Sequence, residues 1–154
     1  MVIKIPGKIL ESFYRRAARI FPKEFYCYLV GEVDGEDVVV REAIYPQAGE
    51  IIGDENFVLP SNYFFQRAKK EAAESGLYVV GDLHSHCYDV GELGLDSGYS
   101  DPSPSYADFT RLGKPPFKGF RFFGICEIVE KRNGRKSKKF TWWEAKPLPK
   151  IKIV

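Results

Sequence analysis

The stretch Leu77-Tyr78-Val79-Val80-Gly81-Asp82-Leu83-His84-Ser85-His86 decides how the rest of the chain is interpreted. It opens with a short apolar run, which predicts a buried strand over residues 77–83. His84 and His86 are the only two histidines of the chain, and they follow this strand two positions apart. Alternation along a strand puts residues i and i+2 on one face. Both imidazoles are therefore expected to point at the same spot, at the carboxyl end of the strand.

A carboxylate further along the chain would complete a metal site with these imidazoles. His84, His86 and Asp108 would offer three protein ligands to zinc and leave a fourth position open, the arrangement of a catalytic rather than a structural zinc. Ser105 and Asp108 lie three positions apart in a segment, 105–112, with the spacing of a helix, so they share a face. The alternative is that Ser105 caps this helix and Asp108 favours its first turn, and both interpretations can hold together.

Three features in this order resemble the JAMM (MPN+) family of zinc metalloproteases. They are His-Ser-His at residues 84–86, Ser-x-x-Asp at 105–108, and Glu24 ahead of the apolar segment 25–31. The resemblance covers residues 8–145 and is to the compact, single-domain, desampylase-like archaeal members. It implies one domain over residues 1–154 with the MPN fold of the α/β class. In that fold a central mixed, curved β-sheet is flanked by helices, an architecture that resembles the cytidine deaminases.

The resemblance also implies a reaction and a role for each site residue. One Zn²⁺ per chain would be held by His84, His86 and Asp108 and would activate a water molecule. Glu24 would act as the general base, and Ser105 would donate a hydrogen bond to the oxyanion of the tetrahedral intermediate. The implied activity is that of a deubiquitinase-like isopeptidase. Its substrate would be a bond after the C-terminal Gly-Gly of a ubiquitin-like β-grasp protein of the small archaeal modifier type.

Two other functions remain open within the same family. One is a peptidase that processes a sulfur-carrier protein, and the other is a non-catalytic MPN module that serves as an assembly scaffold. Scaffold modules typically lack the metal ligands. A zinc deaminase is not indicated, because its signature requires His-x-Glu and Pro-Cys-x-x-Cys, and neither occurs in the chain. A homodimer also remains open.

Two departures from the family pattern affect the active-site loop. Cys87 follows the second histidine where the family usually has proline, and residues 87–104 make the spacing to Ser105 longer than usual. Residues 87–101 are therefore expected to be an insertion, either a surface loop or a flap over a substrate groove. This insertion and the loop 46–56 are the candidate substrate-binding segments.

The remaining patterns predict helices and strands that alternate around this site. Ser61 is expected to be the N-cap of the second helix and Gly76 its C-terminal cap. The tail over residues 146–154 is expected to be either an edge strand or a dimer contact. The predicted helices cover residues 8–21 and 61–76, and the predicted strands cover 25–33, 37–44, 57–59, 120–130 and 140–144, with a basic hairpin tip between the last two.

The composition of the chain limits the classes of protein to which it can belong. The chain has 154 residues, of which 44% are hydrophobic, enough for one domain with a substantial core. Its net charge of +2 is too small to indicate nucleic-acid binding. No apolar run is long enough to cross a membrane, and the N-terminal segment is too short for the apolar core of a signal peptide. The expected location is therefore the cytoplasm, with no membrane partner.

The three cysteines are widely spaced and odd in number. This pattern indicates neither a disulfide framework nor a zinc finger. Cys27 and Cys126 are expected to be buried strand residues, and Cys87 is expected to be a loop thiol next to a metal ligand.

Overall fold

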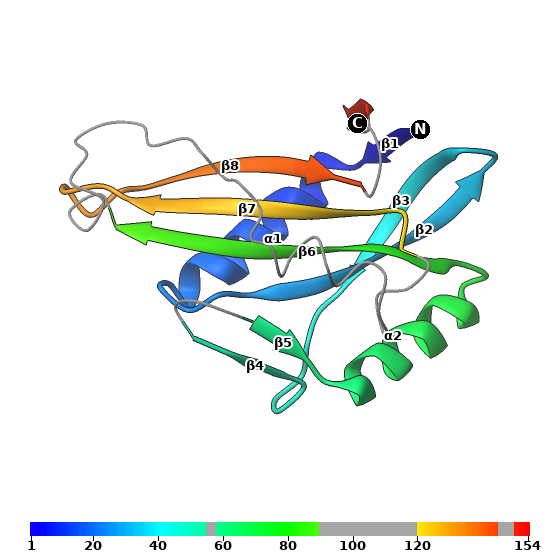
Figure 1. Cartoon of the computed structure of the whole chain (residues 1–154), viewed down its shortest axis with the longest axis horizontal. Coiled ribbons are helices and arrows are strands. Elements are labelled where there is room, and N and C mark those ends of the chain that lie inside the picture. Colours follow the sequence, from blue (N-terminus) through cyan, green and yellow to red (C-terminus); the bar gives the residue numbers. More distant parts are fainter. Residues whose placement is uncertain (55–57, 90–119, 145–149) are drawn as a thin grey trace.

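The computed structural model of the chain describes residues 1–54, 58–89, 120–144 and 150–154. These residues form a curved, mixed seven-stranded sheet, a separate two-stranded sheet and two helices (Figure 1). The α/β fold with a central mixed sheet is therefore confirmed. The helices are α1 (Gly7–Arg19) and α2 (Asn62–Glu74). The strands are β1 (Val2–Ile5), β2 (Tyr26–Asp34), β3 (Asp37–Ile44), β4 (Ile51–Gly53), β5 (Val58–Pro60), β6 (Tyr78–Asp89), β7 (Phe122–Glu130), β8 (Lys136–Trp143) and β9 (Lys150–Ile153).

The histidine-bearing strand β6 lies inside the large sheet, whose order is β8-β7-β6-β2-β3-β1-β9. β6 runs antiparallel to β2 and parallel to β7. His84 therefore has neighbours on both sides, with Tyr26 of β2 and Ile125 of β7 as its Cα partners. Such a position restrains the backbone of the two histidines from both neighbouring strands.

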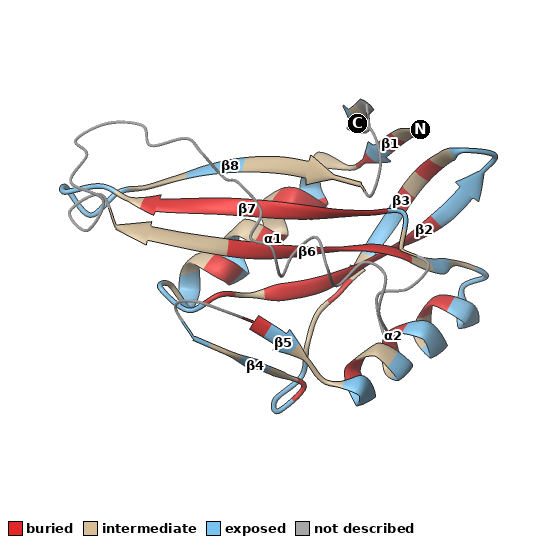
Figure 2. Ribbon diagram, viewed as in Figure 1, coloured by how far each residue is buried: buried red, intermediate tan, exposed pale blue. Residues whose placement is uncertain are grey.

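Apolar clusters cover both faces of the sheet, and β2 contributes to each of them. Cys27 and Leu29 belong to the cluster that includes α1, whereas Tyr26, Tyr28 and Val30 belong to the cluster that includes α2. Figure 2 shows the resulting band of buried residues along β2, β6 and β7. A strand covered on both faces reads as a continuous apolar run, which explains why residues 25–31 show no polar alternation.

The ends of α2 follow the predicted capping pattern. The Ser61 hydroxyl accepts a hydrogen bond from the Phe64 N–H at 3.1 Å. At the other end Gly76 has a φ of +70°, a conformation that glycine adopts without steric cost. The N–H groups of Gly76 and Leu77 donate to the carbonyls of Ala73 and Ala72, which is the Schellman arrangement. Both predicted caps are confirmed.

The predicted end of the histidine strand at residue 83 was wrong. β6 continues to Asp89, because its parallel pairing with β7 extends as far as Glu130. His84, Ser85 and His86 consequently lie within a strand rather than beyond its end. Residues 87–89, predicted as the start of the insertion, also belong to β6, so Cys87 is a strand residue and not a loop thiol. Residues 90–101 lie outside the described residues.

Other differences concern short or peripheral strands. The predicted loop over residues 45–56 contains β4, which pairs with β5. The N-terminal strand β1 was not predicted, and it pairs in parallel with β9, which forms the edge of the sheet. The tail is thus an edge strand over the residues of β9. The predicted helix over 105–112 lies outside the described residues.

The basic hairpin tip is shorter than predicted. The turn forms at Asn133-Gly134, where Gly134 has a φ of +80°, and β8 begins at Lys136. Lys136 and Lys138 are therefore strand residues, and they form ion pairs with Glu130 and Glu11, respectively.

Two of the three cysteines are buried, as predicted. Cys27 and Cys126 are both 0% exposed. Burial raises the pKa of both thiols, so they stay protonated at neutral pH. No helix in the described part of the chain is long and apolar enough to span a membrane.

Candidate metal centre and active site

The two histidine side chains converge on one point, as the strand period predicted. The Nε2 atoms of His84 and His86 lie 3.1 Å apart. Two nitrogen ligands of a tetrahedral zinc ion, each about 2.0–2.1 Å from the metal, would lie about 3.3 Å apart. The imidazoles are therefore spaced as two ligands of one ion would be. His84 is also 1% exposed, so a metal bound there would be sheltered from bulk water on the side of this ring.

Neighbouring rings orient the two imidazoles. The ring of His84 lies nearly parallel to that of Phe123, with centroids 6.4 Å apart and an interplanar angle of 26°. The Tyr88 hydroxyl lies 3.5 Å from Nδ1 of His86, at the limit of a hydrogen bond. If Nδ1–H of His86 donates to this hydroxyl, the lone pair of Nε2 is left for a metal. The Tyr88 hydroxyl is thus placed where it can stabilise the tautomer that a metal ligand needs.

Two buried carboxylates flank the histidine pair. Asp82 is 0% exposed, and the Tyr26 hydroxyl donates a hydrogen bond to its Oδ2 at 2.8 Å. Because Asp82 stands two positions before His84, it lies on the same face of β6. On the other side Glu127, 2% exposed, is the Cα partner of His86. The local negative charge of ionised carboxylates at these positions would favour a bound cation.

Neither of these carboxylates was predicted as a site residue from the sequence. The signal that could have identified them is an acidic residue inside an otherwise apolar strand segment: Asp82 follows Val79-Val80-Gly81, and Glu127 lies between Cys126 and Ile128. Charged groups are rarely buried without a partner or a function.

Glu24 lies immediately before β2, beside the histidine strand, and is 8% exposed. Its N–H donates to the carbonyl of Asp54 at 2.8 Å. The next residue, Phe25, is tied to Ser85 by two hydrogen bonds: its N–H donates to Ser85 Oγ at 2.7 Å, and its carbonyl accepts from the Ser85 N–H at 2.9 Å. With Tyr26 opposite His84, these two bonds hold the segment just before β2, which contains Glu24, beside β6.

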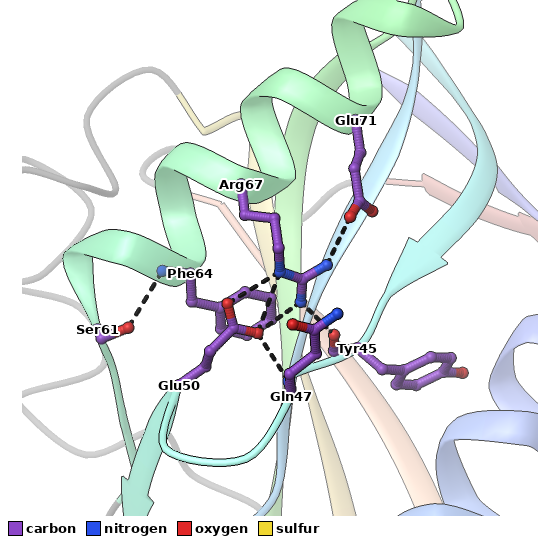
Figure 3. A network of polar contacts seen from close by, with 7 residues as sticks. All are labelled: Tyr45, Gln47, Glu50, Ser61, Phe64, Arg67 and Glu71. Atoms are coloured by element: carbon purple, nitrogen blue, oxygen red, sulfur yellow. Dashed lines mark hydrogen bonds and ion pairs between the residues drawn. The ribbon is translucent and has the colours of Figure 1, made fainter.

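The loop that holds Glu24 through Asp54 is itself anchored by a buried ion pair (Figure 3). Arg67 of α2 donates to both carboxylate oxygens of Glu50, with Nη2 2.6 Å from Oε1 and Nε 2.9 Å from Oε2. The same guanidinium donates to the Tyr45 carbonyl at 2.7 Å and to Glu71 at 2.7 Å. The hydrogen bonds from Arg67 lower the pKa of Glu50 below its ordinary value. The predicted loop 46–56 is therefore a fixed structure over residues 46–54.

Large apolar side chains on the small β4–β5 sheet face the solvent. Ile52 and Leu59 are Cα partners across the two strands and are 68% and 59% exposed. Tyr63, in the first turn of α2, is 70% exposed. Ile52 and Leu59 are here called the β4–β5 apolar surface, and Ile52 lies two residues before Asp54, whose carbonyl accepts from the Glu24 N–H.

The remaining predicted site residues lie outside the described residues. These are Ser105 and Asp108, together with residues 90–101 of the predicted insertion. Among the residues that the structure does describe, no group of three or more His, Cys, Asp or Glu side chains could hold a metal ion. The described part of the site thus consists of two converging imidazoles, with Glu24 fixed beside their strand.

The family of the chain follows from a match over the region just described. Residues 6–90 match the Prok-JAB family, the prokaryotic homologs of the JAB domain. The chain belongs to this family. The matched region runs through β6 and includes Glu24, His84 and His86, so the predicted membership of the JAMM/MPN group is confirmed. The JAB/MPN family includes metalloproteases.

Solved structures share the fold. A protein from Desulfitobacterium hafniense has a TM-score of 0.62 at 17% identity, covering 100% of this chain and 93% of its own. A protein from Salinibacter ruber has a TM-score of 0.56 at 21% identity, and the match covers 98% of this chain and 90% of that protein. A JAB1/MPN domain protein from Archaeoglobus fulgidus has a TM-score of 0.54 at 17% identity, covering 100% and 97%. At these identities the likeness concerns the fold alone. A search among curated proteins found no match.

Proposed function

We propose that this Prok-JAB chain is a zinc-dependent peptidase or isopeptidase. The observation that carries the proposal is the 3.1 Å separation of the His84 and His86 Nε2 atoms, in a family that includes metalloproteases. Two imidazoles at this spacing, one of them buried, fit a metal ion better than they fit a structural role. A scaffold module would have no need of converging Nε2 atoms beside a fixed glutamate.

Each site residue then has a distinct task. His84 and His86 would hold the zinc ion together with Asp108, and the bound zinc supplies Lewis-acid activation of water and of the scissile carbonyl. Glu24 would accept the proton of the attacking water and pass it to the leaving amine. Ser105 would donate a hydrogen bond to the developing oxyanion.

The proposed substrate is a bond after the C-terminal Gly-Gly of a ubiquitin-like β-grasp protein, such as a small archaeal modifier. The family resemblance supports this class, and the β4–β5 apolar surface supports a protein substrate. Exposed apolar side chains gathered in one place are typical of surfaces that bind other proteins. An extended Gly-Gly tail has no bulky side chains, so it could approach a metal held by the buried His84 more closely than a bulkier tail.

Cleavage of a ubiquitin-like protein fused through its C-terminal Gly-Gly to a reporter tests the proposal. The reaction is run with zinc, with a chelator, and with Glu24→Gln, which keeps the shape of the side chain but removes its basicity. We expect cleavage after Gly-Gly that is lost in both controls, while the Glu24→Gln variant still binds zinc.

Two other results would redirect the proposal. A chain that binds one zinc ion but leaves the fusion intact would point to a narrower substrate, for which a sulfur-carrier protein is the next candidate. A chain that neither binds zinc nor cleaves would contradict the proposal and favour the scaffold function.

A further inference from the structure

We infer that Ser85 is a positioning residue that fixes the general base relative to the metal ligands. The inference rests on the proposed function, in which Glu24 is the base and His84 and His86 hold zinc. Ser85 lies between the two histidines, so alternation along β6 turns its side chain to the opposite face of the strand. It therefore acts on the site through the segment that carries Glu24 and not through the metal.

The contact between Ser85 and Phe25 departs from regular strand pairing. In a regular antiparallel ladder, two facing residues exchange N–H donors and carbonyl acceptors. Here the Ser85 N–H donates to the Phe25 carbonyl as expected, but the Phe25 N–H donates to Ser85 Oγ instead of the Ser85 carbonyl. The N–H of Phe25, the residue directly after Glu24, is thus bonded by a side chain of β6 and not by its backbone. This makes the position of Glu24 dependent on one hydroxyl.

Contacts on either side of Phe25 complete the restraint. The N–H of Glu24 donates to the Asp54 carbonyl at 2.8 Å, and Cys87 Sγ lies 3.6 Å from the Lys23 carbonyl. Cys87, like Ser85, lies on the face of β6 that is opposite to the histidines. One strand therefore presents the metal ligands on one face and bonds the segment 23–25 from the other, so β6 acts on both the metal ligands and the base, with Asp54 as a further restraint on Glu24.

The Ser85 hydroxyl is buried and accepts a short hydrogen bond, so its removal should measurably change the rate of the proposed reaction. Ser85 is 0% exposed, and the 2.7 Å hydrogen bond is at the short end of the range for an N–H donor. Without Oγ, the Phe25 N–H loses its partner and the segment 23–25 gains freedom. A general base must lie within hydrogen-bonding reach of the proton it accepts, and a displacement of about 1 Å can cost roughly a hundredfold in rate.

Three variants test the inference. Ser85→Ala removes the hydroxyl, and Ser85→Thr keeps it on a side chain suited to a strand. Ser61→Ala is the matched control, because it removes another serine hydroxyl that accepts a backbone N–H, at the N-cap of α2. For each variant, kcat and KM on the Gly-Gly fusion, zinc affinity by chelator competition, and thermal unfolding are measured. Hydrogen exchange of the backbone amides is measured alongside.

We expect Ser85→Ala to lower kcat about tenfold to a hundredfold while KM and zinc affinity stay near wild type. Ser85→Thr should restore most of kcat, and Ser61→Ala should leave kcat unchanged despite a comparable loss of stability. The amides of Glu24 and Phe25 should exchange faster in Ser85→Ala, whereas those of His84 and His86 should not.

Several results would overturn the inference. An unchanged kcat in Ser85→Ala, a parallel loss of zinc affinity, or unaltered exchange at Glu24 and Phe25 would each remove the positioning role. Wild-type chain that fails to cleave the fusion would count against the proposed function instead, and the exchange measurement would still decide whether Ser85 holds the segment. If Ser85→Thr fails to fold, the comparison of Ser85→Ala with Ser61→Ala decides the matter.

Discussion

His84 and His86 present their Nε2 atoms to one another, whereas Ser85 between them turns to the opposite face and bonds to Phe25. Residues 84–86 thus serve two purposes: the histidines converge on one point, and Ser85 holds Phe25. The two-residue period of the strand puts these two purposes on opposite faces. The sequence was sufficient to predict which side chains share a face, because that period does not depend on where the strand ends. This is why the convergence of the histidines was predicted correctly although the end of β6 was not.

Asp108→Ala tests the third ligand at the scale of a single residue. Two histidines hold zinc much more weakly than a complete set of three ligands, so we expect zinc affinity to fall by at least tenfold, measured by competition with a chromogenic chelator. Full zinc occupancy in this variant would show that a residue other than Asp108 supplies the third ligand.

At the scale of elements, the Glu50–Arg67 pair attaches the loop of residues 45–54 to α2. Its side chains are 5% and 15% exposed, so the charges are largely removed from water. Removal of one partner of a buried pair typically costs about 3–5 kcal/mol, because the other charge is left without compensation. The exposed Glu71, 45% accessible, contributes much less to the same cluster.

Arg67→Met should therefore lower the free energy of unfolding by about 3 kcal/mol, measured in urea at neutral pH. The matched control is Glu71→Gln, for which we expect a loss below about 0.5 kcal/mol. Because Asp54 lies at the end of the same loop, we also expect Arg67→Met to lower kcat, whereas Glu71→Gln should not. Equal losses of stability in both variants would show that the buried Glu50–Arg67 pair stabilises the fold no more than the exposed Arg67–Glu71 pair does.

The lowered pKa of Glu50 gives this pair a pH dependence with a definite sign. A carboxylate whose pKa is lower in the folded state stabilises the fold fully above its unfolded-state pKa, ordinarily 4.5, and loses that contribution as pH falls through the folded-state value. The stability difference between wild type and Arg67→Met should therefore be largest near neutral pH and shrink on acidification, as Glu50 is protonated. A constant difference down to pH 3 would contradict this assignment.

The β4–β5 apolar surface leads to a prediction about substrate binding. Ile52→Glu places a charge in the middle of this surface but leaves the core intact, because Ile52 is 68% exposed. We expect KM for the Gly-Gly fusion to rise about tenfold or more with little change in kcat. Tyr78→Glu is the control, because Tyr78 is similarly exposed at 67% and lies at the opposite end of β6 from the histidines. Equal KM values for both variants would place substrate binding elsewhere.

At the scale of the whole molecule, zinc should stabilise the fold through residues on β6 and the segment around residue 108. A ligand that binds only the folded state at a hundred times its Kd adds about 2.7 kcal/mol of stability. For a chain of this size that amounts to a rise in Tm of about 5–10 °C. We expect this rise in wild type by calorimetry and its absence in His84→Ala. A zinc-dependent rise of equal size in His84→Ala would place the metal elsewhere.

Sequence patterns predicted the parts of the fold that depend on local chemistry. The caps of α2 and the hairpin between β7 and β8 follow from residue type and spacing. Sequence patterns did not predict β1 or β4, because each is short, and the strands that pair with β1 lie far along the chain. Likewise Glu24 could be named only through a family resemblance, since nothing local marks a lone glutamate before a strand as catalytic. Its restraint by Ser85 and Asp54 depends on contacts between distant segments.

The parallel pairing of β1 with β9 has a consequence for the order of folding. On one side β1 pairs with β3, but on its other side residues 2–5 pair with residues 150–153, so this contact has among the largest sequence separations in the sheet. The hairpin of β2 and β3 can form as soon as its own residues have left the ribosome, and β1 can then pair with β3, whereas the other side of β1 must wait for β9. We therefore infer that the β1–β9 edge closes after synthesis of residues 150–153. Contacts of such long range raise the contact order of the fold, and proteins of higher contact order fold more slowly.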